Sequence, residues 1–155
     1  MVQVTHPGML NFRFMLLLVF MTGISAATAL AQDNTSTTGK YIKTRGFNMY
    51  YETYGQGEPL LIIHGNGGSA KDFVNQVPFF KEHYQLIVTE SRSQGHSMDT
   101  GDSLTYEMMA DDLNAILDSL HKDSCYVIGW SDGGINGLLL AMRHPDKVKK
   151  LAVTG

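Results

Sequence analysis

The chain has a single cysteine and no cluster of positive charge, and these scarcities exclude several classes of protein. Cys125 is the only cysteine among 155 residues, so no intramolecular disulfide can form. No group of cysteines and histidines has the spacing of a zinc site, so we predict no metal. The formal charge is −3, from 12 Lys and Arg against 15 Asp and Glu, with no basic run. We therefore expect no nucleic-acid partner.

What is present is typical of a folded domain. Hydrophobic residues make up 43% of the chain and charged residues 17%, which is a globular rather than a disordered composition. The length allows one domain.

Residues 1–31 have the features of a secretory signal peptide. They contain no acidic residue, and the apolar run from Phe14 to Met21 is followed by small residues that end in Ala29-Leu30-Ala31. This pattern predicts cleavage after Ala31 and export to the periplasm or the exterior. The alternative is an N-terminal membrane anchor, but polar residues from Thr22 onward interrupt the run before the roughly 20 apolar residues that span a bilayer. Membrane contact is therefore expected only through the transient signal.

The rest of the chain divides into a linker and a folded part. Residues 32–39 read QDNTSTTG and lack aliphatic side chains, so we predict a flexible linker. We predict a partial domain over residues 40–155.

Six segments of the folded part are rich in β-forming or continuously apolar residues. They are Tyr41–Thr44, Phe47–Tyr54, Leu60–Ile63, Tyr84–Thr89, Cys125–Ile128 and Val148–Val153. Arg45 and Gly46 are expected to form a tight turn between the first two.

Helical spacing of apolar residues predicts three helices between these strands. They are expected over Lys71–Glu82, where Pro78 should kink or shorten the helix, over Ser103–Leu120 with Tyr106 on its core face, and over Gly134–Arg143. We assign Ser103 as a helix cap. Strands that alternate with helices indicate an α/β fold with a mostly parallel, doubly wound sheet.

The segment Gly129-Trp130-Ser131-Asp132-Gly133 is a G-x-S-x-G motif between a strand and a helix. Such a sharp turn strains the backbone of Ser131, and it is tolerable because Gly129 and Gly133 carry no Cβ atom. The motif therefore predicts an exposed serine hydroxyl.

In this motif and its context the chain resembles the α/β-hydrolase superfamily over roughly residues 41–155. Residues 129–135 are most similar to biphenyl hydrolase-like and related esterases. The resemblance implies that Ser131 is the nucleophile and that the backbone N–H groups of Asn66 and Asp132 form the oxyanion hole. It also makes the Asp132 carboxylate and Trp130 candidate contacts for a substrate. The alternative is that Asp132 is a solvated turn residue that supplies only its N–H.

Three other polar positions are interpreted as structural. The loop from Glu90 to Ser97 is similar to the D-x-R-G-x-G-x-S loop of that superfamily, with Glu90 for the acid and Ser93 for the glycine. His64 opens the oxyanion loop His64–Gly68 and is expected to be hydrogen-bonded scaffold rather than a general base. Cys125 is expected to be a small buried hydrophobe.

The G-x-S-x-G motif does not include the catalytic acid and histidine that would act with Ser131. The superfamily places an acid and then a histidine after the serine, whereas here His144 precedes Asp146. We therefore expect the two partners and two further strands to lie beyond Gly155. The prediction is the N-terminal portion of an exported serine hydrolase acting on small carboxylic esters, without a cofactor and inactive by itself.

Two alternative functions are also compatible with the sequence. One is a non-catalytic remnant or binding module that uses its unpaired sheet edge. The other is a C–C bond hydrolase, lipase, peptidase or perhydrolase on the same fold, which fold-level resemblance does not separate from an esterase. The sequence makes no prediction about the oligomeric state.

Overall fold

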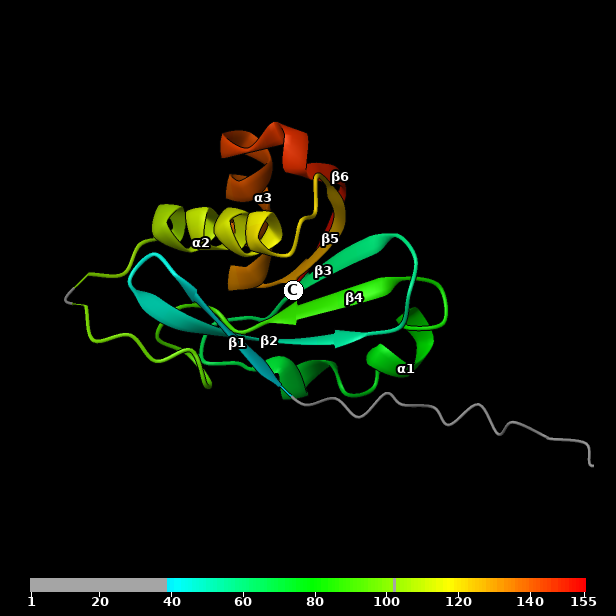
Figure 1. Cartoon of the computed structure of the whole chain (residues 1–155), viewed down its shortest axis with the longest axis horizontal. Coiled ribbons are helices and arrows are strands. Elements are labelled where there is room, and N and C mark those ends of the chain that lie inside the picture. Colours follow the sequence, from blue (N-terminus) through cyan, green and yellow to red (C-terminus); the bar gives the residue numbers. More distant parts are fainter. Residues whose placement is uncertain (1–38, 102) are drawn as a thin grey trace, which may run out of the picture. The chain divides into compact units, whose positions relative to one another are not determined.

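A computed structural model of the chain describes residues 39–101 and 103–155 (Figure 1). The predicted signal peptide, residues 1–31, and the predicted linker up to residue 38 lie outside the described residues. In the described ranges no helix combines the length and the apolar character needed to cross a membrane.

The described residues form one mixed sheet of six strands in the order β1-β2-β4-β3-β5-β6. Strand β2 pairs antiparallel with β1 and β4, and the pairs β4–β3, β3–β5 and β5–β6 are parallel. The strands are β1 Lys40–Thr44, β2 Phe47–Tyr54, β3 Pro59–Ile63, β4 Gln85–Thr89, β5 Cys125–Trp130 and β6 Val148–Thr154. All six lie where the sequence predicts them.

The opening hairpin is closed by the predicted two-residue turn. Thr44 pairs with Phe47, and Arg45 and Gly46 between them have φ angles of 43° and 92°. Two positive φ angles in a two-residue loop match the right-handed twist of the flanking strands.

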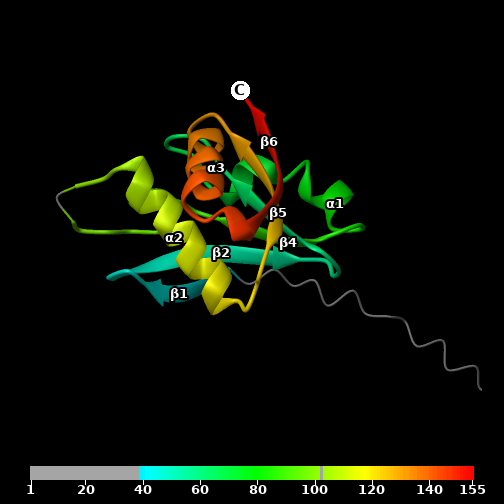
Figure 2. The same cartoon turned by 90° about the horizontal axis from the view of Figure 1, so that it is seen from above.

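Both faces of the central strands β3 and β4 are buried, as their continuous apolar runs indicate, whereas the edge strands β1 and β6 are largely exposed. Helices α2 (Tyr106–Ser119) and α3 (Asp132–Arg143) cover one face, and the short helices η1 (Ala70–Phe73) and α1 (Val77–Phe80) cover the other (Figures 1 and 2). The side chains of neighbouring β3 residues point to opposite faces of the sheet. Leu61 packs in the cluster under α2 and α3, whereas Leu60 packs with Phe73 and Val77 on the other face.

The helix predicted over Lys71–Glu82 is wrong in length. The segment folds as η1 and α1, with Pro78 in the first turn of α1. Proline has no N–H to donate and fits the first turn, where that N–H has no partner in any case. The prediction that Pro78 shortens the helix is confirmed.

The predicted starts of the two longer helices also need correction. The N-cap of α2 is Thr105 rather than Ser103, since Thr105 Oγ1 accepts a hydrogen bond of 3.2 Å from the N–H of Met108. Ser103 lies outside the helix, and its hydroxyl is 3.9 Å from Met108 Sδ. Helix α3 starts at Asp132, directly after Ser131 and two residues earlier than predicted.

Arg92 ties the loop after β4 to α2 and to the opening hairpin. It is 4% exposed, and its Nε and Nη2 atoms each donate a 2.7 Å hydrogen bond to the carboxylate of buried Asp112 on α2. It also donates to Asp99 at 2.7 Å, and its guanidinium carbon lies 4.1 Å from the ring centroid of Phe47. These hydrogen bonds, the one with Asp112 foremost, raise the pKa of Arg92, so the cation is fixed in the interior.

The turn from β5 into α3 is packed too tightly for any side chain at its two glycines. A Cβ atom on Gly129 would lie 2.3 Å from the carbonyl oxygen of Gly133, and one on Gly133 would lie 2.2 Å from the carbonyl oxygen of Ile63. Both neighbours are backbone atoms, which cannot rotate away. Helix α3 can therefore start directly over the end of β3 only with glycine at these positions.

Replacing Arg92 by methionine should destabilise the fold by about 2–3 kcal/mol, because the buried Asp112 carboxylate would lose two charge-assisted hydrogen bonds and keep only its ion pair with the more exposed Arg45. The free energy of unfolding from urea denaturation measures this. Arg143→Met, which breaks the more exposed pair with Asp111, is the matched control and should cost clearly less. The double variant Arg92→Met, Asp112→Leu should recover part of the loss. Equal effects of Arg92→Met and Arg143→Met would contradict the assignment of Arg92 as a buried anchor.

Gly133→Ala should destabilise the fold by about 1–3 kcal/mol or more, because the strand β3 backbone must move to admit the methyl group. Gly137→Ala, in the same helix, is the control. There the nearest atom is the side-chain methyl Leu151 Cδ1 at 2.9 Å, and helix propensity favours alanine by about 1 kcal/mol. Thermal unfolding should therefore shift strongly for Gly133→Ala and little for Gly137→Ala, and the reverse order would contradict the packing.

Candidate active site around Ser131

Ser131 is the single residue between β5 and α3, and its backbone is strained. Its φ and ψ angles are 53° and −119°, a conformation that costs a residue with a side chain about 1–3 kcal/mol. Its N–H donates a 2.7 Å hydrogen bond to the carbonyl of Thr154 on β6, and its own carbonyl accepts one of 2.8 Å from the N–H of Gly134. The backbone is thus held from both sides. The residue is exposed, and no described residue hydrogen-bonds its hydroxyl.

The loop His64–Gly68 passes directly beside this serine. A Cβ atom on Gly65 would lie 3.3 Å from Ser131 Cβ, so a side chain here would crowd the serine. The N–H of Gly67 donates to Gln94 Oε1 at 2.6 Å, and the N–H of Gly68 donates to the carbonyl of Gly65 at 3.1 Å. The N–H of Asn66, between them, donates to no described residue.

The second free amide lies at the start of α3. Asp132 is the first residue of the helix, so its N–H has no partner within the helix, and none of the described residues accepts from it. The N-terminal end of a helix carries partial positive charge. The amides of Asn66 and Asp132, on the two segments that meet at Ser131, are therefore both free to bind a negative oxygen.

His64 is fully engaged in holding the loop in place. It is 1% exposed, its Nε2 accepts a 2.9 Å hydrogen bond from the N–H of Ser91, and its Nδ1 lies 2.7 Å from the carbonyl oxygen of Gly65. The N–H of Ser91 requires an unprotonated Nε2, so the proton sits on Nδ1 and is donated to Gly65. No nitrogen of this ring remains to take a proton from Ser131, in agreement with the scaffold role predicted for it.

Glu90 fixes the second loop at this end of the sheet. Its carboxylate is buried and accepts from the N–H of Ala70 at 3.1 Å through Oε1, and from the N–H and ring Nδ1 of His96 through Oε2. Ser93, at the position of a glycine in the similar superfamily loop, has a φ angle of 61°. That left-handed conformation explains why glycine suits the position.

Gln94 supports the loop beside Ser131, a role that the sequence does not predict. Its side-chain oxygen binds the Gly67 N–H across 27 residues of sequence. No periodicity or local motif marks such a contact, because it depends on two loops that meet only in the folded sheet.

Trp130 and Asp132 flank the serine on the same turn. Trp130 is 44% exposed, and a Cβ atom on Gly65 would lie 3.4 Å from its ring atom Cε3. The Asp132 carboxylate accepts a hydrogen bond from the hydroxyl of Tyr106, the first residue of α2. Desolvation first, and this hydrogen bond second, raise the pKa of Tyr106. Tyr106 is exposed at this site, so its predicted place on the core face of the helix is wrong.

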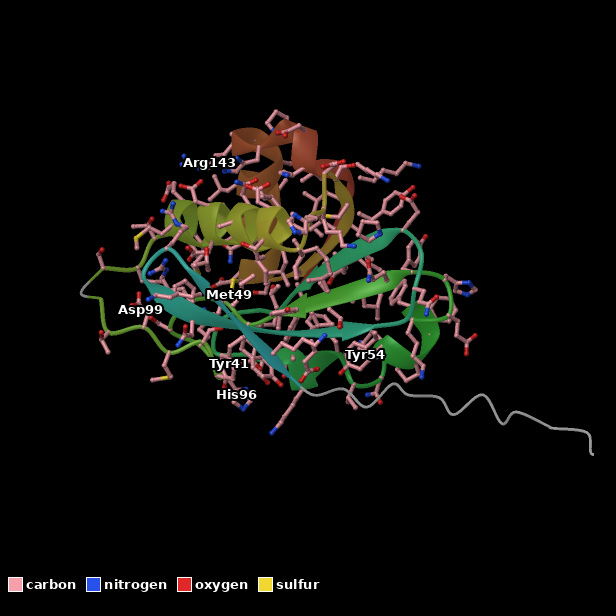
Figure 3. All side chains as sticks on the ribbon, in the orientation of Figure 1. Tyr41, Met49, Tyr54, His96, Asp99 and Arg143 are labelled. Atoms are coloured by element: carbon pink, nitrogen blue, oxygen red, sulfur yellow. The ribbon has the colours of Figure 1, made fainter. Side chains whose placement is uncertain are left out.

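Two other described histidines, His96 and His144, are bound to carboxylates. His96 is held by Glu90, and His144 Nε2 lies 2.9 Å from Asp111 Oδ1 at the far end of α3. The 12 residues of α3 span about 18 Å. Arg143 and His96 lie on opposite sides of the sheet (Figure 3). Within residues 39–101 and 103–155 no group of three metal-ligating side chains occurs.

Comparison with known proteins gives one family and several relatives. A family model described as the alpha/beta hydrolase fold matches residues 58–155. A cis-3-alkyl-4-alkyloxetan-2-one decarboxylase of Shewanella oneidensis is 32% identical over 117 residues, which cover 73% of this chain and 37% of that protein. The serine hydrolase BPHL of Mus musculus is 28% identical over 138 residues, which cover 85% of this chain and 47% of that protein.

Among solved structures, Est816, described as an N-acyl homoserine lactone degrading enzyme, superposes with a TM-score of 0.71 at 27% identity. The match covers 75% of this chain and 46% of that one. The chain thus spans less than half the length of the relatives it matches. The family match includes both the loop His64–Gly68 and the Ser131 turn, and the strand order agrees with it. This chain therefore belongs to the alpha/beta hydrolase fold family.

Proposed function

We propose that this chain carries the nucleophile and the oxyanion hole of a serine hydrolase that acts on small carboxylic esters. One observation supports this most strongly. The Ser131 hydroxyl is exposed at a strained turn beside two backbone amides, those of Asn66 and Asp132, that have no partner among the described residues. In the proposed reaction the hydroxyl oxygen attacks the ester carbonyl as its proton passes to a base, and the two amides bind the oxyanion. The alcohol then leaves with that proton, and water hydrolyses the acyl-serine to release the carboxylic acid.

The relatives support hydrolysis more broadly than they support esters. BPHL is described as a serine hydrolase, Est816 as degrading a lactone, and the Shewanella relative as a decarboxylase. A lactone is a cyclic ester, which favours an ester substrate for this chain. A C–C bond hydrolase, lipase, peptidase or perhydrolase remains the alternative on the same fold.

The general base is proposed to come from outside the described residues. A serine hydroxyl is a poor nucleophile until a histidine takes its proton, and no described histidine hydrogen-bonds Ser131. We therefore propose that residues 40–155 alone have negligible turnover. The same observation favours the second candidate, a non-catalytic remnant or binding module. Export to the periplasm or exterior, through residues 1–31, is also part of the proposal.

Fusing residues 40–155 to the C-terminal part of mouse BPHL, in place of the matching BPHL segment, should yield a chimaera that hydrolyses p-nitrophenyl butyrate. Ser131→Ala should lower kcat of the chimaera by at least about a thousandfold, because the nucleophile is lost. The unfused chain should not exceed the buffer rate. Covalent labelling by a fluorophosphonate, located by mass spectrometry, should map to Ser131.

Ser103→Ala is the control for this experiment, because Ser103 lies outside α2 and the site and should leave kcat unchanged. Cooperative thermal unfolding of each chimaera establishes that it is folded. A folded Ser131→Ala chimaera that keeps its activity would rule out Ser131 as the nucleophile. A folded, unsubstituted chimaera that neither turns over nor takes the label would favour the binding module.

Asp132→Asn separates the two roles proposed for this residue, since asparagine keeps the backbone N–H and the shape but removes the charge. If the carboxylate attracts a substrate ammonium, the kcat/KM ratio of an ester with a free α-ammonium to its N-acetylated form should fall about tenfold in the chimaera. The rate with an uncharged ester should stay the same. An unchanged ratio would mean that Asp132 contributes only its N–H.

A further inference from the structure

A concave site separate from Ser131 lies between the opening hairpin, β4 and the end of α2. It is a cavity of about 190 Å³ on the face covered by α2, lined by Lys40, Tyr51, Thr53, Gln85, Ile87, Leu120 and Lys122. Gln85 is the first residue of β4, whereas Ser131 follows the last residue of β5, and both strands run parallel to β3. The cavity therefore begins at the end of β4 opposite the Ser131 turn and reaches along β2 to Tyr51, which pairs with Thr89 at the other end of β4.

Three hydrogen-bond donors converge on this cavity. Lys40 pairs in register with Tyr51, so their side chains share one face of the hairpin. The Tyr51 side chain is only 8% exposed, and neither its hydroxyl nor the Lys40 ammonium has a partner among the described residues. Lys122, just beyond α2, contributes a second ammonium. Although Tyr51 as a whole is buried, its hydroxyl oxygen stays accessible to solvent, so it can donate to a ligand that enters the cavity.

Acceptors at the cavity are few and largely occupied. The side-chain oxygen of Gln85 already accepts a 2.6 Å hydrogen bond from Lys122 Nζ, and no carboxylate lines the cavity. The last carbonyls of α2 would repel an anion, but those of Ile116, Leu117 and Asp118 already accept hydrogen bonds from the following N–H groups. An excess of cationic and neutral donors over free acceptors selects a negatively charged ligand.

The apolar lining and the volume of the cavity limit the part of the ligand that carries no charge. Ile87, which is 1% exposed, and Leu120 are its apolar lining, and both belong to the core under α2. A volume of 190 Å³ equals the share of about six water molecules, well below that of a drug-sized pocket. The ligand should therefore have an anionic head and a short hydrocarbon tail.

We propose that this cavity binds a short-chain monocarboxylate of about the size of butyrate. Lys40, Lys122 and the Tyr51 hydroxyl donate to the carboxylate, and the tail packs on Ile87 and Leu120. The site is separate from Ser131 and does not rest on the proposed hydrolase function, so its test involves no turnover.

Titration of the ¹⁵N-labelled chain with sodium butyrate at constant ionic strength, followed by amide chemical shifts, tests the proposal. Saturable shifts in β1, at the start of β4 and after α2 are expected, with a millimolar Kd. Lys40→Gln and Tyr51→Phe should each weaken binding by about tenfold, the loss of one hydrogen bond to a charged group. The Lys40 side chain makes no hydrogen bond or ion pair within the described residues, so its replacement should leave the fold intact.

Two controls separate this site from general attraction of anions. Lys43→Gln removes the same charge from the same strand, but from the other face of β1, and should leave the Kd unchanged. Butylammonium has the same tail and the opposite charge, and should cause no saturable shift. The proposal is overturned by the absence of saturation up to about 100 mM butyrate. It is also overturned if butylammonium binds equally, or if Lys40→Gln binds as the unsubstituted chain does.

Discussion

The left-handed backbone of Ser131 is the constraint on which the arrangement of the site depends. It is maintained by packing on three sides: the Thr154 carbonyl of β6 holds its N–H, the first turn of α3 holds its carbonyl, and Gly133 presses against the Ile63 carbonyl at the end of β3. Relaxing the angle would move α3 away from β3. The strain and the close helix–strand packing are therefore one feature, which directs the serine side chain outward beside the His64–Gly68 loop.

Buried polar contacts extend this rigidity from the turn to the loops around it. His64 joins the loop after β3 to the loop after β4 through Ser91, and Glu90 joins that second loop to the start of η1. Arg92 anchors the same loop to α2 through Asp112. The carboxyl ends of the parallel strands are thus linked by hydrogen bonds that leave the Asn66 and Asp132 amides unused. Under the proposed function these two amides are set before any substrate arrives, which is what makes an oxyanion hole effective.

Most of the sheet and the turn at Ser131 could be predicted from the sequence, because each depends on residues that are close together in the chain. Continuous apolar runs located β3 and β4, Arg45-Gly46 located the hairpin turn, and two glycines around Ser131 located the sharp bend. Features decided by tertiary contacts were missed or misplaced. The hydrogen bond from Gly67 to Gln94 and the cavity between Lys40 and Lys122 each join segments that are far apart in the sequence. The N-cap of α2 is Thr105 rather than the similar residue Ser103, a choice that local sequence does not decide. No single-sequence pattern distinguishes those outcomes.

In the proposed site the Ser131 oxygen and the two free amides face the same point. A crystal structure of the BPHL chimaera after reaction with a fluorophosphonate tests it most directly, because the adduct places a tetrahedral phosphorus on the serine oxygen. A phosphonyl oxygen is expected within about 3 Å of both the Asn66 and the Asp132 nitrogen. An adduct on Ser131 whose phosphonyl oxygens point to solvent, with both amides bound elsewhere, would contradict it.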